Sequence, residues 1–288
     1  MLKNHQELNM QVKILLFSLL WTLTFSCKSS PPPQESCDYF TMNKFNKLLV
    51  ATGVPYANGR NVEVIDLDNP SKTCILSADF PYELRDAVGG FTSCGPMVCS
   101  GHYGSSYSAD CYSLRSNGQF VKMSELTMDT PRSDASSIVT EDGKLMISGG
   151  WNGGRLADTE IINVLESKTE DGFQLPNGIY EHCSVLINAT TVIVLGGYDG
   201  SSIQKSTYFI NLETLQVTDG PEMQEARRYF GCAVFEHNQH NFVIAAGGFP
   251  STDSTEFLQL EATRFRWSKG KTNLNNYLDS TLRIHNNS

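Results

Sequence analysis

A short apolar run that ends in one or two glycines occurs five times in this chain of 288 residues. The last glycines of the runs are Gly53, Gly101, Gly150, Gly197 and Gly248, so the spacings are 48, 49, 47 and 51 residues. A period of this length indicates tandem supersecondary units, either blades of a β-propeller or units of a solenoid. The chain is therefore predicted to be a repeat protein.

The interior of one period distinguishes these two architectures. The fourth unit reads as four short strands divided by turn residues, at 183–187, 192–195, 206–212 and 216–218. Its second strand is apolar throughout, whereas its third strand alternates more, as expected on passing from the inner to the outer part of a sheet. Because no stretch has helical periodicity, we predict an all-β propeller of four-stranded blades.

The glycines are expected to act as structural turns. A residue without a Cβ permits both a positive φ and a close approach between neighbouring backbones. A phosphate-binding loop would need a helix directly downstream, and each pair is followed instead by a loop and a strand. The predicted turn glycines are Gly53, Gly101, Gly149, Gly150, Gly196, Gly197, Gly247 and Gly248.

The repeated segments resemble the kelch family, whose unit is an apolar run ending in a glycine pair, followed by a tyrosine-containing strand and a stretch with Met, Pro and Arg. The best match is 196–202 with 221–234, and similar stretches lie at 128–138 and 267–268. The resemblance spans roughly residues 47 to 270. Units one and two keep a single glycine, and the late tryptophan of the pattern is replaced in units one to four by Cys74, Phe120, Phe173 and Val217.

The resemblance leaves two alternatives for the number of blades. Residues 279–285 read like the first strand of a further unit and could complete the first unit, which would close a five-bladed ring. Otherwise the chain would be a truncated ring of six or seven blades, the numbers usual in the family.

The N-terminus carries an uncharged apolar run at 14–25, preceded by Lys13. Twelve residues are too few to span a bilayer comfortably, and Thr24 and Ser26 fit the small positions of a cleavage site. We predict a signal peptide at 1–26 and a secreted protein without a membrane span after cleavage; a retained signal-anchor is the competing interpretation. Residues 27–46 are expected to be a linker with an N-terminal segment, and 47–288 the propeller.

Composition agrees with a large extracellular domain. Hydrophobic residues make up 40% of the chain and charged residues only 18%. This proportion of apolar residues is sufficient for a sizeable core. Its formal net charge of −9 argues against nucleic acid and anionic membranes as partners.

Eight cysteines indicate an oxidising compartment. Cys99 ends one predicted strand and Cys111 begins the next, so a Cys99–Cys111 disulfide is predicted, with Cys74–Cys94 as a second pairing. Cys183 and Cys232 occupy equivalent positions in successive units and are interpreted as two buried free thiols.

No catalytic constellation or metal-ligand spacing stands out, so we predict no enzyme activity, no metal and no cofactor. The kelch resemblance implies two enzymatic alternatives. A galactose-oxidase-like copper site would draw on Cys99, His102, Tyr103, Tyr107 and Tyr198, and a sialic-acid-epimerase-like site on arginines in loops near the propeller axis.

The preferred prediction is a module that binds an extracellular protein or glycan through its loops. Aromatic residues after the glycine turns are candidate contacts, and arginines before the first strands could bind a carboxylate or anchor loops. These candidates are Tyr103, Tyr107, Trp151, Tyr198, Phe249, Arg132, Arg227 and Arg228. Acceptor sequons for N-glycosylation begin at Asn188, on a predicted hairpin tip, and at Asn286.

Overall fold

The computed structural model describes residues 47–51, 60, 62–66, 73–75, 80–115, 119–250, 253–260 and 266–270. Within these ranges every regular element is a β-strand, as predicted, and no helix there is long and apolar enough to cross a membrane. The predicted signal peptide, the linker and the strand at 279–285 lie outside the described residues.

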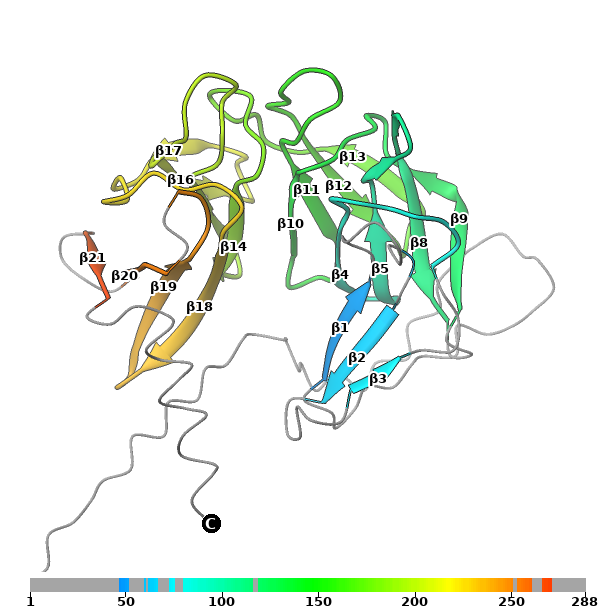
Figure 1. Cartoon of the computed structure of the whole chain (residues 1–288), viewed down its shortest axis with the longest axis horizontal. Coiled ribbons are helices and arrows are strands. Elements are labelled where there is room, and N and C mark those ends of the chain that lie inside the picture. Colours follow the sequence, from blue (N-terminus) through cyan, green and yellow to red (C-terminus); the bar gives the residue numbers. More distant parts are fainter. Residues whose placement is uncertain are drawn as a thin grey trace, which may run out of the picture.

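The strands form five antiparallel sheets in chain order, which we call sheets I to V, and one small hairpin (Figure 1). Sheet I has three strands, sheets II to V have four strands each, and the hairpin of β6 and β7 is inserted in sheet II. Sheet I contains β1 (Lys47–Ala51), β2 (Val62–Asp66) and β3 (Thr73–Ile75). Sheet II contains β4 (Val88–Thr92), β5 (Gly95–Cys99), β8 (Asp110–Leu114) and β9 (Phe120–Thr127), with the hairpin β6 (His102–Tyr103) and β7 (Ser106–Tyr107). Sheet III contains β10 (Ser136–Val139), β11 (Leu145–Ser148), β12 (Thr159–Asn163) and β13 (Lys168–Asp171). Sheet IV contains β14 (Cys183–Asn188), β15 (Thr191–Leu195), β16 (Thr207–Asn211) and β17 (Val217–Asp219). Sheet V contains β18 (Gly231–His237), β19 (His240–Ala246), β20 (Thr255–Gln259) and β21 (Trp267–Lys269).

The strand boundaries predicted for the fourth unit agree with sheet IV to within one residue. Its second strand, β15, is buried along most of its length, whereas three of the five residues of β16 are only half-buried. The predicted tip at Asn188 lies at the turn between β14 and β15.

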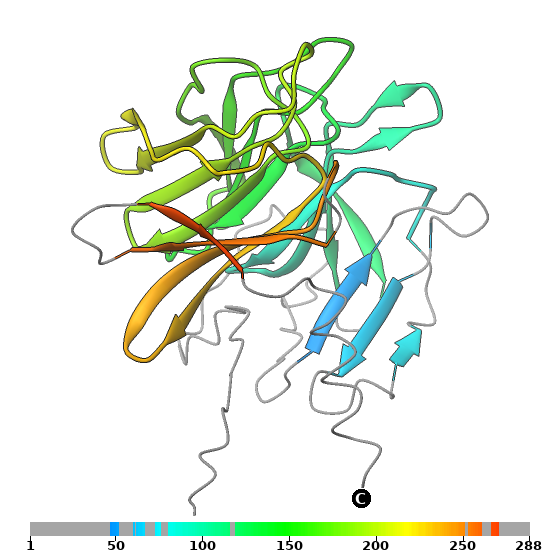
Figure 2. The same ribbon diagram turned by 60° about the vertical axis from the view of Figure 1, so that its left-hand side comes forward.

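Neighbouring sheets contact each other through their first strands. Strand β10 lies against both β4 and β14, and β14 also contacts β18. Figure 1 shows β10 between β4 and β14, with the fourth strands β9, β17 and β21 toward the outside, and Figure 2 shows the same sheets turned by 60°. Apolar clusters fill the spaces between the sheets; one cluster joins Met97 of sheet II to Leu145 and Ile147 of sheet III. The first strands therefore form the inner part of the molecule.

The glycine turns connect each sheet to the next. The amide of Gly101 donates to the carbonyl of Arg132, that of Gly150 to Ile179, and that of Gly197 to Arg227, at 2.7 to 2.8 Å. In each case the acceptor stands just before the first strand of the following sheet. All the predicted turn glycines in the described ranges have a positive φ, as expected; Gly53 lies outside those ranges.

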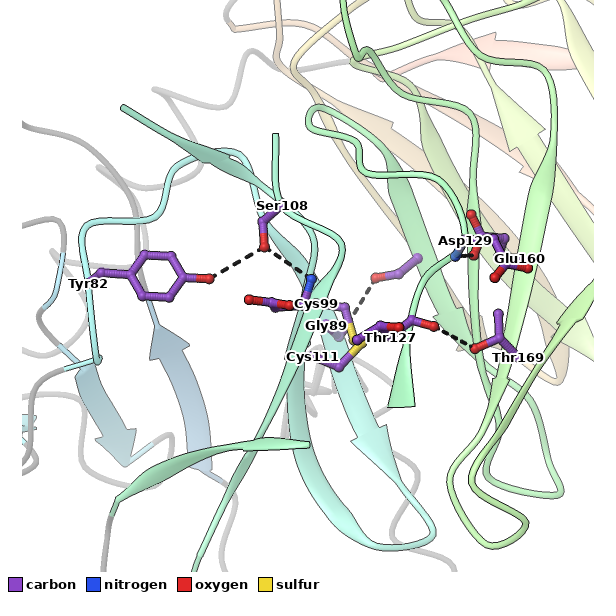
Figure 3. Close-up of a disulfide and its surroundings, with 11 residues drawn as sticks. Tyr82, Gly89, Cys99, Ser108, Cys111, Thr127, Asp129, Glu160 and Thr169 are labelled. Carbon is purple, nitrogen blue, oxygen red and sulfur yellow. Dashed lines mark hydrogen bonds between the residues drawn. A yellow bond between two sulfur atoms is a disulfide. The ribbon is translucent and has the colours of Figure 1, made fainter. Parts of the chain in front are cut away.

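The predicted disulfide between Cys99 and Cys111 is present and joins β5 to β8, with Cα atoms 4.1 Å apart (Figure 3). Nearby hydrogen bonds hold sheet II against sheet III: the Ser137 hydroxyl donates to the Gly89 carbonyl, and the Thr169 hydroxyl to the Thr127 carbonyl. Cys94 is also disulfide-bonded, while the side chain of Cys74 lies outside what the structure describes.

The interpretation of Cys183 and Cys232 as free thiols is wrong. They form a disulfide between β14 and β18, with Cα atoms 6.0 Å apart. Cys183 is the first residue of β14, and Cys232 is the second residue of β18. Because β14 contacts β18, the two cysteines come within bonding distance.

Candidate functional site

Four residues at equivalent positions of sheets II to V form a hydrogen-bonded row on the inner part of the molecule. Asp86, Asp134, Glu181 and Tyr229 each stand two residues before a first strand and have φ between 52° and 58°. The amide of each one donates to the carbonyl of the preceding one: Asp134 to Asp86 at 3.1 Å, Glu181 to Asp134 at 2.8 Å, and Tyr229 to Glu181 at 3.0 Å. We call these four residues the inner row.

The inner row borders a pocket of about 180 Å³ that is open to the surface, which we call the cavity. Each sheet from II to V contributes its inner-row residue and the residue that follows it. The lining residues are Asp86, Ala87, Asp134, Ala135, Glu181, His182, Tyr229 and Phe230. Four successive units of the repeat thus deliver their equivalent positions to one space.

The cavity is acidic. Burial raises the pKa of the Asp134 carboxyl, and the neighbouring charges of Asp86 and Glu181 raise it further, against the hydrogen bond that the Ser133 hydroxyl donates to it. Burial also raises the pKa of the Tyr229 hydroxyl, as do its hydrogen bond to Glu181 and the Asp134 charge. The phenol therefore stays protonated at neutral pH and can donate.

His182 is a buried neutral member of the lining. It is 6% exposed, and burial lowers its pKa to about 3. Its Nε2 lies 3.1 Å from the hydroxyl of Ser148, whereas its Nδ1 has no hydrogen-bond partner in the described part of the protein.

Aromatic side chains lie beside the inner row, mostly on the loops that follow the glycine turns. Each of these loops pairs with the residue just before the inner row, as in the bridges Ser133 to Trp151 and Tyr180 to Tyr198. We call the rim the set of aromatic residues Tyr103, Tyr107, Trp151, Tyr180, Tyr198 and Phe249, and the loop face the surface formed by the rim and the cavity.

Rim residues form a nearly continuous series. The indole of Trp151 donates to the hydroxyl of Tyr107 at 3.0 Å, and its ring centroid lies 5.1 Å from that of Tyr180. Tyr180 in turn lies 5.5 Å from Tyr198. At one end of the rim Phe249 is 52% exposed, and Tyr103 at the other end has the same exposed fraction. The predicted aromatic contacts therefore share one face, where Trp151 and Tyr198 also pack between loops.

Arg228 links the rim to the inner row. Its guanidinium carbon lies 5.1 Å from the ring centroids of Tyr198 and Phe249 and 5.6 Å from that of Tyr229. Its Nη1 donates to Glu181 at 3.1 Å. The guanidinium of Arg228 therefore neutralises the Glu181 carboxylate and is itself held among three aromatic rings.

Arg132 and Arg227 are not surface contacts, contrary to one of the sequence interpretations. Both side chains are 0% exposed and act as internal anchors. Arg132 donates to the Gly149 carbonyl and pairs with Glu160; Arg227 donates to the Gly247 carbonyl and pairs with Glu256. A guanidinium offers five donors, which suits it to a carboxylate and carbonyls together.

The sequence did not reveal the inner row. Its members are 48, 47 and 48 residues apart, but they are two aspartates, a glutamate and a tyrosine, so no shared residue type marks the position. What they share is a left-handed backbone conformation. This conformation is typical of glycine, and the sequence of other residues predicts it only weakly.

The described residues include no group of three or more His, Cys, Asp or Glu side chains placed to hold a metal ion. Cys99, which the copper-site alternative would use in a tyrosine cross-link, is occupied by its disulfide to Cys111. The Nδ1 of His102 instead accepts a hydrogen bond from the Nη2 of Arg85 at 2.6 Å.

Comparison with known proteins identifies no relative: no family model matches the chain, and no match is found among curated proteins.

Proposed function

We propose that this chain is a kelch-repeat β-propeller that is secreted and binds an extracellular protein or glycan, without catalysis, through its loop face. The observation that carries the proposal is the convergence of equivalent residues from sheets II to V on one cavity, with aromatic side chains beside the inner row. The propeller itself is supported by contacts between successive first strands and by glycine amides that bond to the following sheet.

Secretion is supported by the apolar run at 14–25 and by the disulfides, which persist in oxidising compartments. Expression of the whole chain in eukaryotic cells tests it: the protein should appear in the medium with its N-terminus after Ser26. Retention in cells with residues 1–26 still attached would favour the signal-anchor alternative.

The opposite end of the sheets gives the proposal a matched control. Phe249 on the rim is 52% exposed, and Phe91 near the end of β4, close to the turn into β5, is 45% exposed. Both substitutions, Phe249→Ala and Phe91→Ala, remove one exposed phenyl ring, but only the first alters the loop face. Asn188, the predicted glycosylation site, also lies at a turn on the Phe91 end, so a glycan there would leave the loop face open.

Binding should be screened with the secreted protein on a glycan array and on a display library of extracellular domains. A ligand of the loop face should lose at least about tenfold in affinity with Phe249→Ala and keep its affinity with Phe91→Ala. A ligand affected only by Phe91→Ala would contradict the assignment of the face. Stoichiometric copper with turnover of galactose would overturn the non-catalytic proposal in favour of the oxidase alternative.

A further inference from the structure

The charge around the cavity is unbalanced. Its lining carries three carboxylates, from Asp86, Asp134 and Glu181, and none of the lining residues is a lysine or arginine. Arg228 pairs with Glu181 from the rim side, whereas the guanidinium of Arg85 bonds to the ring of His102 and forms no salt bridge with a carboxylate of the described residues. Among the described residues, the side-chain donors to the Asp134 carboxylate are the hydroxyls of Ser133 and Tyr229, which are neutral.

The size of the cavity limits what it can hold. About 180 Å³ is below the range of roughly 300–1,000 Å³ typical of sites that enclose a drug-sized ligand. The space suits one terminal group of a larger molecule, with the remainder of that molecule lying across the loop face.

Two further features fit a donor-rich, positively charged group. His182, which lines the cavity and is nine-tenths buried, has an Nδ1 without a hydrogen-bond partner among the described residues, and its neutral ring adds no positive charge to the lining. Tyr229 also lines the cavity and is 60% exposed, so its ring is available for a cation–π contact beyond the one that it makes with Arg228.

We propose that this cavity binds a single basic side chain, an arginine or lysine, presented by a protein partner. This inference rests on the proposed binding function and specifies its ligand class. The carboxylates of Asp86 and Asp134 would pair with the cation, and the rim would cover the adjoining segment of the partner. A cation is favoured over a sugar hydroxyl because it compensates the charge of Asp86 and Asp134, for which the described residues supply no salt-bridge partner.

The test uses the full secreted chain and three capped peptides, acetyl-Gly-Arg-Gly-amide, its lysine analogue and its citrulline analogue. Citrulline has nearly the shape of arginine but no charge. Calorimetric titration should give binding of the arginine or lysine peptide at least about tenfold tighter than that of the citrulline peptide, with a strong dependence on salt. Equal binding of the arginine and citrulline peptides, or no binding of either basic peptide, would overturn the proposal.

Variants locate the site. Asp134→Asn should weaken the arginine peptide at least about tenfold, and so should Asp86→Asn, a change of an exposed residue that leaves the buried network in place. The matched control is Asp219→Asn on the outer strand β17, which should not change binding. Unchanged affinity in both cavity variants would refute the proposal.

The result is separable from the proposed function. A glycan or acidic protein that binds the loop face and is not displaced by the arginine peptide would refute the basic-side-chain inference while leaving the binding module intact.

Discussion

At the scale of single residues, the buried position four residues before each first strand is occupied alternately by an apolar residue and by an arginine. Arg132 and Arg227 fill it in sheets III and V, and Leu84 and Ile179 fill it in sheets II and IV. The partner position on the third strand changes in step: it is Glu160 or Glu256 with the arginines, and Cys111 or Tyr208 with the apolar residues. An arginine is therefore used only where a carboxylate faces it, as expected for a charge buried away from water.

Arg132→Met should destabilise the protein by about 3–5 kcal/mol, because it leaves the carboxylate of Glu160 buried without its cation. Glu160 would keep only the amides of Asp129 and Thr130 as donors. Urea unfolding measures the loss. The control Lys168→Met breaks an exposed pair with Glu170 and should cost less than about 1 kcal/mol. Adding Glu160→Gln to Arg132→Met should restore part of the stability; no recovery would contradict the buried-charge explanation.

His182 should make the protein sensitive to mild acid. Its pKa is about 3 in the folded protein and about 6.5 when unfolded, so below pH 6.5 the unfolded chain binds a proton that the folded chain does not. Stability falls as the pH drops through this window, by about 2 kcal/mol from roughly pH 7 to pH 5. Urea unfolding of His182→Gln should show a loss smaller by that amount, whereas the exposed control His240→Gln should behave like the natural protein. Equal acid sensitivity of His182→Gln and the natural protein would contradict burial of a neutral imidazole.

At the scale of elements, the second glycine of each pair is constrained by its surroundings as well as by its φ. Gly197 has φ +96°, and a Cβ there would lie 2.7 Å from the Cβ of His182. Gly153 has a similar φ of +100°, but a Cβ there would meet nothing within 4 Å. A substitution at Gly153 therefore tests the effect of backbone conformation alone, whereas one at Gly197 adds the effect of steric contact.

Gly153→Ala should cost about 1 kcal/mol, the penalty for placing an L-residue in this conformation. Gly197→Ala should cost at least about 2 kcal/mol more, because the added methyl group displaces His182 and the amide bond from Gly197 to the Arg227 carbonyl. Chemical denaturation compares the two variants. Equal losses would mean that the glycine pair serves only its backbone conformation.

Elements were more predictable than the site that they build. The apolar runs and turns of sheet IV determine its strands locally, so periodicity located them to within one residue. The position after the glycine turns predicted five of the six rim residues, but not Tyr180, which stands just before the inner row. The buried arginines and the Cys183–Cys232 disulfide depend on which residues from distant segments face each other, such as Glu160 and Arg132 across 28 positions. Local sequence patterns do not show which residues from distant segments come into contact, so these contacts could not be predicted from the sequence.

At the scale of the whole molecule, sheet I differs from the others because it has three strands and not four. Gly53 follows β1 in the sequence, as the glycine turns follow β5, β11, β15 and β19, so β1 corresponds to a second strand. The position of a first strand in sheet I has no occupant among the described residues, and first strands are the elements through which neighbouring sheets touch. An unpaired β1 edge beside that position would be open to aggregation.

Residues 279–285, which read as a first strand, are predicted to fill this position and close a five-bladed ring. Truncation after Leu278 should then lower the unfolding midpoint by at least about 5 °C and promote aggregation, since 1 kcal/mol corresponds to about 2–4 °C in a protein of this size. Truncation after His285 removes only three residues and should leave the midpoint unchanged. A synthetic peptide of residues 279–285 should raise the midpoint of the shorter protein in proportion to the logarithm of its concentration. Equal unfolding midpoints of the two truncated proteins would contradict closure of the ring by residues 279–285.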